Sequence, residues 1–336
     1  MASNWSIVML WGWQNSSQIL GSYHFFPALR VTRGRLDRSF IESGLAAAKK
    51  QCLHVPGGCS RDGSNVVLQD VWEYWPSNAS WRDVTPSLPG PGPRWRHTLV
   101  WSESDGGCLL FAGASNLEVW LLQPNASGYQ WSAVSVVSNP SAPGNRLHTA
   151  VAANVDGQSA MLVYGGIGGT NPKQRLFAFF PHNGTWTTRA NGPGSNSFVR
   201  YSHTAVWAAE LNLMLVFGGA ITGGLNDLHA YSPATDTWQQ LGPSGALPNG
   251  RLGHVAVWTG SAMIVASGQG GNEDGAWVWR PVPDLQGSWE KTSTSVYPGF
   301  DLDNKRGAAA WDPFTSRMFY GFRGTADFWW SYQLPG

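Results

Sequence analysis

Four histidines recur along the middle of the chain, each two or three residues after an arginine. Imidazole nitrogen is a common ligand of zinc, copper and iron, so a ring of such histidines could hold a metal ion. All ligands of one metal must lie about 2 Å from a single point, whereas residues repeated around a ring are held apart. We therefore favour a structural role, in which each histidine hydrogen-bonds the backbone of the neighbouring repeat. The four are His97, His148, His203 and His254.

The arginines form a second repeated set. A guanidinium group can bind a carboxylate through two parallel hydrogen bonds, so a ring of arginines could hold an acidic peptide or another carboxylate ligand. The same groups could instead bond backbone carbonyls of adjacent repeats, and their strict repetition favours this structural role. The six arginines are Arg38, Arg94, Arg146, Arg200, Arg251 and Arg306.

Three cysteines are too few, and odd in number, for a disulfide framework. Cys52 and Cys108 fall at equivalent places at the start of a predicted second strand. We expect them to be small buried residues rather than nucleophiles or a bridge. Cys59, in a loop next to Gly57-Gly58, is the cysteine whose reactivity we would test.

Composition excludes some partners. The chain of 336 residues is 42% hydrophobic and carries a formal net charge of only +1. Nucleic acids and anionic membranes attract basic surfaces, so we expect neither as a partner. No apolar run reaches membrane-spanning length. The composition does not indicate an oligomeric state.

The compartment is left open. The first residues, MASNWSIVMLWGWQ, lack the basic segment and cleavage site of a signal peptide, so a cytoplasmic location is the default. Secretion is the alternative, because Asn-x-Ser/Thr sequons could accept glycans. They lie at Asn4, Asn15, Asn78, Asn125 and Asn183.

The clearest copy of the repeated unit is Arg200–Leu241. Apolar runs at His203–Val206, Met214–Phe217 and Leu228–Tyr231 are followed by a turn and Trp238. Four short runs separated by Gly, Pro, Asn and Asp predict four strands joined by tight connections. The opening arginines recur at gaps of 51 to 56 residues, and a four-stranded unit of this period is typical of a propeller blade.

Glycines and tryptophans recur with the arginines. Glycines end the predicted second strand of each unit, where the chain must turn sharply out of the sheet. The tryptophan of the fourth strand is expected to cover the neighbouring blade with a large apolar face. The glycines are Gly57-Gly58, Gly113, Gly165-Gly166, Gly218-Gly219, Gly268 and Gly321, and the tryptophans are Trp81, Trp131, Trp186, Trp238 and Trp289.

In these features the chain resembles the kelch-repeat family, whose units carry a double glycine, an Asn-Asp before the third strand and a spaced tryptophan. The segment VFGG…LNDLHAYSPATDTW matches this pattern closely. The resemblance covers about 300 residues and implies a single all-β domain, a kelch-type β-propeller. It implies no one function, because propellers host many unrelated roles.

We predict six blades closed by an N-terminal strand. The last unit has no fourth-strand tryptophan, and Asn4–Val8 resembles the fourth strand Gln130–Val134. In the alternative, Val8–Trp13 aligns with the second strand Met318–Phe322 and begins a partial seventh blade. The predicted single domain, residues 1–336, comprises the closing strand 1–9 and blades 38–93, 94–145, 146–199, 200–250, 251–305 and 306–336.

The loops after the glycines differ in length and charge from one unit to the next. Variable loops on a rigid scaffold are where binding residues concentrate. We therefore predict a non-enzymatic propeller, without a cofactor, that binds a protein or peptide partner through loops on one face. The residues assigned to this face are Arg61, Asp62, Asn116, Lys173, Arg175, Glu273, Asp274 and Arg323.

Two other functions stay open. The sequence has no nucleophile elbow, phosphate loop or paired-cysteine metal motif. A propeller active site is assembled from residues scattered over all blades, however, so the first alternative is an enzyme with its site at the mouth of the central channel, either metal-dependent or metal-free. The second is carbohydrate binding, suggested by the 20 tryptophans.

Overall fold

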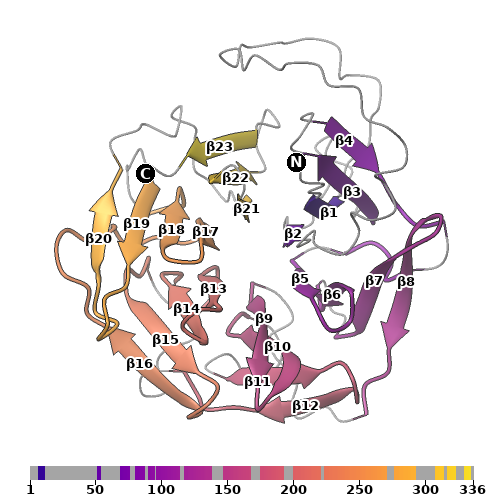
Figure 1. The fold of residues 1–336 in the computed structure, drawn as a ribbon, viewed down its shortest axis with the longest axis horizontal. Coiled ribbons are helices and arrows are strands. Elements are labelled where there is room, and N and C mark those ends of the chain that lie inside the picture. Colours follow the sequence, from indigo (N-terminus) through magenta and orange to yellow (C-terminus); the bar gives the residue numbers. More distant parts are fainter. Residues whose placement is uncertain are drawn as a thin grey trace.

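The chain folds into mainly antiparallel sheets arranged as a ring, a β-propeller (Figure 1). The description comes from a computed structural model. In the part of the chain that it describes, no helix is long and apolar enough to cross a lipid bilayer. The described residues are 7–11, 51–53, 69–75, 80–87, 90–94, 96–113, 117–137, 147–167, 175–192, 200–220, 223–270, 276–292, 307–313, 316–322 and 329–333.

The described strands make five complete four-stranded blades and one three-stranded sheet. The first blade contains β1 (Ile7–Trp11), β2 (Gln51–Leu53), β3 (Asp70–Trp75) and β4 (Ser80–Asp83). The second contains β5 (Thr98–Ser102), β6 (Gly107–Phe111), β7 (Val119–Asn125) and β8 (Gly128–Val134). The third contains β9 (Thr149–Val155), β10 (Gln158–Tyr164), β11 (Leu176–Phe180) and β12 (Thr185–Thr188).

The remaining strands continue around the ring. The fourth blade contains β13 (Thr204–Ala208), β14 (Leu213–Phe217), β15 (Leu228–Ser232) and β16 (Thr237–Leu241). The fifth contains β17 (Val255–Trp258), β18 (Met263–Ala266), β19 (Ala276–Arg280) and β20 (Ser288–Lys291). The three-stranded sheet contains β21 (Gly307–Asp312), β22 (Arg317–Phe322) and β23 (Trp329–Gln333).

The innermost strand of each sheet contacts the innermost strands of both neighbours. The contacts run from β2 through β5, β9, β13 and β17 to β21, and β21 contacts β2 again. The inner strands therefore form a closed cycle around one axis (Figure 1). Side chains on these strands are placed where they can line a central channel.

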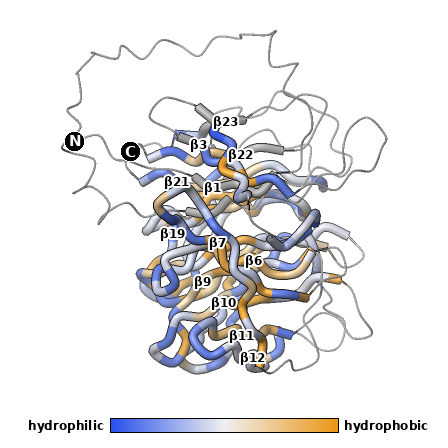
Figure 2. Tube along the Cα trace, turned by 90° about the vertical axis from the view of Figure 1, so that its right-hand side faces the viewer, coloured by the Kyte–Doolittle hydropathy of each residue, from blue (hydrophilic) through white to orange (hydrophobic). Residues whose placement is uncertain are grey.

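The core lies between the blades. On β14, every residue of the run LMLVF is buried. Leu215 and Phe217 pack with residues of the fifth blade, and Met214 and Val216 pack with residues of the third. A second strand is thus covered on both faces, which explains why it is apolar without alternation. Figure 2 shows the hydrophobic residues concentrated along the strands and the hydrophilic ones at the turns.

The N-terminal strand lies in the first blade, so the prediction that it closes the last blade is wrong. Along its whole length β1 pairs antiparallel with β3, from Ile7 opposite Tyr74 to Trp11 opposite Asp70. On its other side it pairs in parallel with β2. It therefore occupies the second-strand place of the first blade.

The physical reason is the apolar pattern of the strand. The run IVMLW is continuously apolar, as are the second strands LMLVF and GCLLF, whereas an outer strand such as TWQQL is largely exposed. Between two partners a strand also satisfies its backbone groups on both edges. The alternative alignment of Val8–Trp13 with a second strand found the right kind of strand, but the strand belongs to the first blade rather than to an additional one.

Candidate functional site

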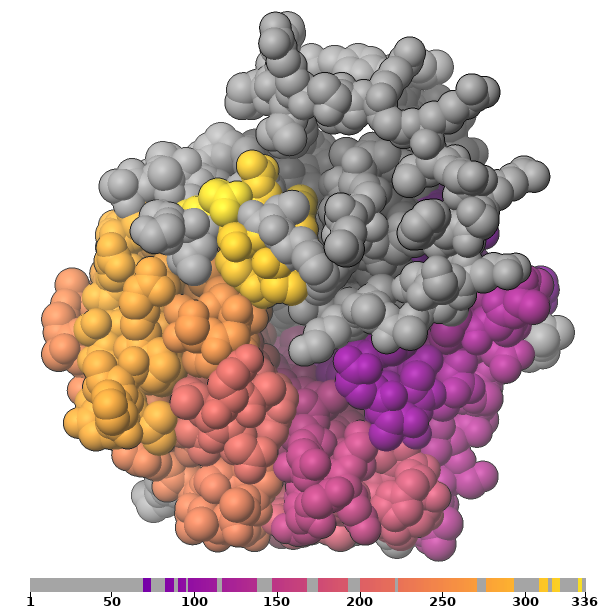
Figure 3. Space-filling view, viewed as in Figure 1, coloured from indigo at the N-terminus to yellow at the C-terminus, as the bar shows by residue number. Residues whose placement is uncertain are grey.

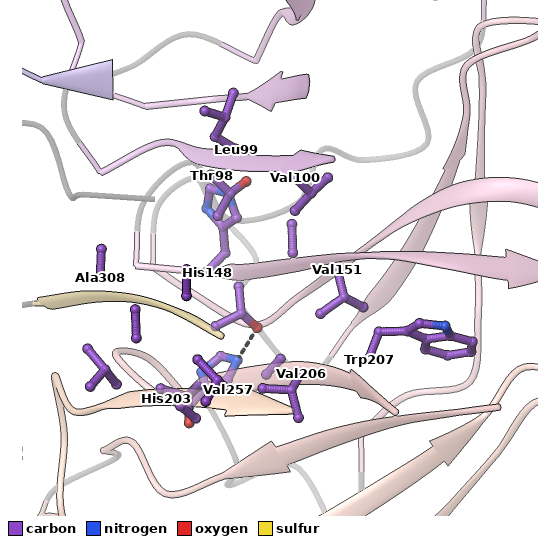
Figure 4. Close-up of a pocket in the computed structure, with 18 of the residues that line it drawn as sticks. Thr98, Leu99, Val100, His148, Val151, His203, Val206, Trp207, Val257 and Ala308 are labelled. Atoms are coloured by element: carbon purple, nitrogen blue, oxygen red, sulfur yellow. Dashed lines mark hydrogen bonds between the residues drawn. The ribbon is translucent and has the colours of Figure 1, made fainter. Parts of the chain in front are cut away.

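The inner strands enclose a cavity of about 390 Å³ along the axis. Its wall comes mainly from β5, β9, β13, β17 and β21 and is mostly apolar, with alanine, valine and tryptophan the commonest apolar residues and histidines and threonines toward one end (Figure 4). The space-filling view shows the described blades grouped around a central hollow (Figure 3). A channel lined in this way offers few polar groups to a ligand.

The repeated histidines bond from one blade to the next. Each of three histidines places its Nε2 close to the hydroxyl of a threonine that begins the inner strand of the preceding blade. The Oγ1–Nε2 distance is 3.0 Å for Thr98 and His148, 2.8 Å for Thr149 and His203 (dashed in Figure 4) and 2.8 Å for Thr204 and His254. The expected link between neighbouring blades is thus present, but its partner in these pairs is a threonine side chain.

Each of these histidines, together with the fourth-strand tryptophan of its own blade, packs against an aromatic side chain of the preceding blade. Tyr164, at the end of β10, has its ring centroid 5.3 Å from that of His203 and 4.8 Å from that of Trp238. Phe217, at the end of β14, lies 5.4 Å from His254 and 5.0 Å from Trp289.

Phe111, at the end of β6, is held in the same way by His148 and Trp186 of the third blade. We call this repeated contact the aromatic clamp. It confirms that Trp186, Trp238 and Trp289 cover the neighbouring blade.

Left-handed backbone precedes each histidine. Leu147, Ser202 and Gly253 have φ values of 63°, 53° and 66°. The N–H of Ser202 donates to the carbonyl of Leu147 at 3.1 Å, and the N–H of Gly253 donates to the carbonyl of Ser202 at 2.9 Å. These bonds join successive blades at the histidine end of the channel, and they account for a backbone conformation that costs a non-glycine residue about 1 kcal/mol or more.

The repeated arginines bond carbonyls of their own blades. Nη1 of Arg94 donates to the carbonyl of Ala112 at 3.1 Å. Nη1 of Arg200 donates to the carbonyl of Gly218 at 2.7 Å, and Nη1 of Arg251 donates to that of Ser267 at 3.1 Å. All three acceptors occupy the first position after a second strand. The structural role is therefore confirmed for these three arginines. Bonds to the neighbouring repeat are present as well: Arg94 also donates to the carbonyls of Pro91 and Gly92, within the limits predicted for the first blade. Arg251 donates to the carbonyl of Asn249, within the limits predicted for the fourth.

One arginine also holds a carboxylate. Arg200 donates to both oxygens of Asp227, at 2.7 Å and 2.6 Å. His229 Nε2 donates to Asp227 Oδ2 at 2.7 Å. Burial alone would raise the pKa of Asp227, but the hydrogen bonds from His229 and Arg200 outweigh it and hold this pKa far below its usual range. The network ties the first strand of the fourth blade to its third strand.

Two of the buried repeated histidines, His203 and His254, favour the neutral form. Burial, aided by the charge of Arg251, lowers the pKa of His254 to about 3. Burial and the charge of Arg200 also hold the pKa of His203 well below its usual range. Among the described residues, no three His, Cys, Asp or Glu side chains gather closely enough to hold a metal ion.

A family model described as the KLHDC2/KLHL20/DRC7 Kelch-repeats domain matches residues 43–271. The chain belongs to the kelch-repeat family. The match covers every complete blade from the second to the fourth and the aromatic clamps between them. The arginines, histidines, glycines and tryptophans described above are therefore kelch-repeat residues that build the ring.

Similar proteins contain the kelch region as one part of a longer chain. Mouse multiple epidermal growth factor-like domains protein 8 is 28% identical over 222 residues, which are 60% of this chain and 8% of that protein. The Drosophila melanogaster leucine-zipper-like transcriptional regulator 1 homolog is 28% identical over 233 residues, 64% of this chain and 23% of that protein. The Xenopus laevis Rab9 effector protein with kelch motifs is 24% identical over 213 residues, 60% of this chain and 56% of that protein. The matched segment thus spans less than two thirds of each relative.

The predicted partner-binding residues lie almost entirely outside the described residues. Arg175 is described: it is exposed and immediately precedes β11. Arg61, Asp62, Asn116, Lys173, Glu273, Asp274 and Arg323 fall outside, as do the repeated arginines Arg38, Arg146 and Arg306. The assignment of these residues to a binding face stays a prediction.

The cysteines differ from expectation. Cys108 is buried on β6, as expected, but it is disulfide-bonded rather than a free thiol. The side chains of the other two cysteines, Cys52 and Cys59, lie outside the described part of the chain.

Sequence reasoning also missed the threonine partners. A His-Thr pair stands at residues 97–98, 148–149 and 203–204, and in the fifth blade Val255 follows His254. This repeated dipeptide was the available signal. The dipeptide did not show that each threonine hydroxyl bonds the histidine of the following blade, because that contact depends on how the two sheets pack against each other.

The glycine pairs pack closely against the clamp. A Cβ on Gly218, whose φ is 60°, would lie 2.9 Å from Cε1 of His254, and a Cβ on Gly219 would lie 2.7 Å from Cβ of His203. In the second and fifth blades the first glycine is replaced by Ala112 and Ser267, with φ values of 59° and 63°. These two residues keep the left-handed conformation at a cost in energy.

Replacing Ser267 by glycine should therefore stabilise the fold. We expect Ser267→Gly to raise the free energy of unfolding by about 1 kcal/mol, because glycine adopts positive φ without steric penalty. The neighbouring change Ala266→Gly, inside β18, should lower it, because it adds backbone freedom to a strand. Chemical denaturation of the two variants measures both effects, and a destabilised Ser267→Gly protein would contradict this account.

Stability should also fall in mild acid. The unfolded chain takes up protons on histidine near pH 6.5, whereas the folded His254 stays neutral down to about pH 3. Each such histidine therefore removes about 1.4 kcal/mol of stability per pH unit as the pH drops below 6.5. Between pH 6.5 and 4.5, the free energy of unfolding measured by chemical denaturation should fall less steeply with decreasing pH in His254→Gln than in the unaltered chain. The same substitution at the exposed His182 is the control. If the slope of unfolding free energy against pH in His254→Gln equals that of the unaltered chain, His254 is not held neutral.

Proposed function

We propose that this kelch propeller is a non-enzymatic module that binds a protein or peptide partner through the loops of one face. The proposal rests on the observation that the repeated polar groups are occupied by contacts inside the ring. The described members of the arginine and histidine sets are buried and bonded within the ring. Recognition is then left to residues that differ between blades.

The variable loops begin at one end of the propeller. Phe111 ends β6 opposite Thr98, which starts β5, and Tyr164 ends β10 opposite Thr149, which starts β9. The same antiparallel pairing recurs in the fourth and fifth blades and in the three-stranded sheet. Segments that follow second strands therefore start around the histidine end of the channel, where several of them could contact one partner.

The relatives support a protein partner. One of them is named as an effector of Rab9, and another relative is host cell factor of Drosophila melanogaster, 34% identical over 83 residues. The candidate contact residues are Arg61, Asp62, Asn116, Lys173, Arg175, Glu273, Asp274 and Arg323. They carry charges of both signs, which suits a polar rim rather than an apolar groove.

We also propose that the ring has six blades and forms one domain over residues 1–336. The three-stranded sheet would be the last blade, and its contacts with both neighbouring inner strands support this count. The described strands of the second to fifth blades fall within the proposed limits 94–145, 146–199, 200–250 and 251–305. The first blade, 38–93, is joined by β1, and the last is 306–336.

The loop face can be tested by photo-crosslinking from two positions of the full chain. A photoreactive residue at Arg175, beside the variable loop, should capture a partner from cell extract, whereas one at the exposed Arg82 of the outer strand β4 should not. For the captured partner, Lys173→Glu with Arg175→Glu should weaken binding by about tenfold or more, because opposed like charges cost over 1.4 kcal/mol.

The Arg82→Glu variant should bind as the unaltered chain does. Equal capture at both positions, or unchanged affinity after charge reversal, would contradict the loop-face proposal. A captured glycan or a turned-over small molecule would instead favour the carbohydrate-binding or enzymatic alternative.

A further inference from the structure

Two Asn-x-Ser/Thr sequons lie in described hairpins that join a third strand to a fourth. Asn125–Ser127 belongs to the hairpin of β7 and β8, in which Asn125 pairs with Gly128. Asn183–Thr185 belongs to the hairpin of β11 and β12, in which Phe180 pairs with Thr185. The middle residue is alanine in one and glycine in the other. Both segments therefore have the sequence of an acceptor for an N-linked glycan.

Both asparagines are accessible in the folded chain. Asn125 and Asn183 are exposed, and each lies in the hairpin that leads into the outermost strand of its sheet, β8 or β12 (Figure 1). A glycan is large and hydrated, so it needs a position on the rim rather than between packed blades. The remaining sequons lie outside the described residues, at Asn4, Asn15 and Asn78.

In each hairpin the hydroxyl of the sequon is bonded to the asparagine amide. Ser127 donates to Oδ1 of Asn125 from its N–H at 2.9 Å and from Oγ at 3.0 Å. Thr185 donates to Oδ1 of Asn183 from its N–H at 3.1 Å and from Oγ1 at 2.7 Å. These Asx-turns occupy the oxygen of each amide, whereas a glycan is attached to the nitrogen.

The nitrogen of Asn125 also has room for a substituent. Its Nδ2 donates to Oε1 of the exposed Gln130 at 3.3 Å. An N-linked glycan replaces one of the two hydrogens on Nδ2, so this bond can be kept. The turn geometry is thus compatible with a glycan in the folded state.

The turn by itself requires a polar residue but not a complete sequon. In the fourth blade the place of Asn183 is taken by Thr235, whose hydroxyl is 2.7 Å from that of Thr237. In the corresponding hairpin of the fifth blade, Asp284 accepts from the N–H of Gln286 at 3.1 Å. Threonine and aspartate thus support such turns without an amide nitrogen, and the second and third blades have the sequon instead.

A separate observation concerns the compartment in which such glycans are attached. Cys108 on β6 is disulfide-bonded. Disulfides form and persist in oxidising compartments and are rare in the cytosol. The lumen of the secretory pathway, where N-glycans are added, is oxidising. The disulfide and the two exposed sequons therefore favour the same compartment.

Both hairpins lie at the end of the propeller opposite the variable loops. Val119, which starts β7, lies opposite Phe111 at the loop end, and β7 runs from there to Asn125. Leu176, which starts β11, lies opposite Tyr164 at the loop end, and β11 runs to Phe180. Glycans on these hairpins would leave the loop face uncovered.

We propose that Asn125 and Asn183 are N-glycosylated and that the protein matures in the secretory pathway. The sugar donor is a lipid-linked oligosaccharide pyrophosphate. A bond forms between Nδ2 and the anomeric carbon of the first sugar, and the bond from that carbon to the pyrophosphate oxygen breaks. Nδ2 loses a proton and the lipid pyrophosphate leaves, without oxidation or reduction. Because the glycans and the loop face lie at opposite ends, either can be present without the other.

The full chain, isolated from the cells that make it, can be treated with peptide-N-glycosidase in heavy-oxygen water. The enzyme converts each glycosylated asparagine to aspartate that contains heavy oxygen, which mass spectrometry of the peptides detects. We expect labelled aspartate at positions 125 and 183. Without prior reduction, Cys108 should resist alkylation. Unmodified asparagine at both positions would overturn the proposal, and a freely alkylated Cys108 would overturn its oxidising compartment.

Matched variants test each acceptor in eukaryotic cells that secrete the full chain behind an added leader. Ser127→Ala and Thr185→Ala should each remove the glycan at the asparagine of the same sequon, whereas Thr185→Ser should keep it. Thr237→Ala, at the same turn position of the fourth blade, should keep both glycans and controls for altered folding. A secreted chain without a glycan at either asparagine, or glycans that persist in both sequon variants to alanine, would contradict the assignment.

Discussion

The ring depends on the aromatic clamp between neighbouring blades. The second strands of three blades end in an aromatic residue, Phe111, Tyr164 or Phe217. Each of these rings packs against the histidine and the tryptophan of the next blade. Apolar burial alone is non-directional and would let two sheets slide over each other. The edge-on histidine and its bond to a threonine fix one relative position, since a shift would leave a buried imidazole nitrogen without its partner.

Several other features follow from this contact. The histidine needs open space beside the end of the second strand, so the first residue after that strand is glycine or a residue forced to positive φ. The arginine bonds the carbonyl at that same position and so holds the turn in place. The repeated histidines and arginines, which looked most capable of chemistry, are thereby buried and bonded within the ring. This use of the repeated polar groups is consistent with the proposal that recognition falls to the loops.

The sequence predicted the repeated parts well. The spacing of Arg200 and Arg251 located the blades, and Trp238 and Trp289 were correctly expected to cover a neighbour, because a residue that recurs in every unit must serve a contact that recurs in every unit. The loop residues around Lys173 could be assigned only by exclusion. No periodic pattern describes them, since each loop occurs once.

Other parts needed the three-dimensional arrangement. The N-terminal run Ile7–Trp11 has the composition of a strand, but only pairing decides which sheet receives it. The spacing of the three cysteines likewise did not reveal that Cys108 is disulfide-bonded.

The central claim, that the repeated histidines build the ring and do not bind the partner, is tested most directly by a double-mutant cycle on Thr204 and His254. Thr204→Val should cost about 1–3 kcal/mol of stability because a buried imidazole nitrogen loses its partner. Combined with His254→Phe, it should cost less than the sum of the two single changes, giving a coupling of about 1 kcal/mol. The affinity for the partner captured at Arg175 should stay unchanged in the folded variants. Additive stability effects together with lost partner affinity would contradict the account and place the histidines in recognition.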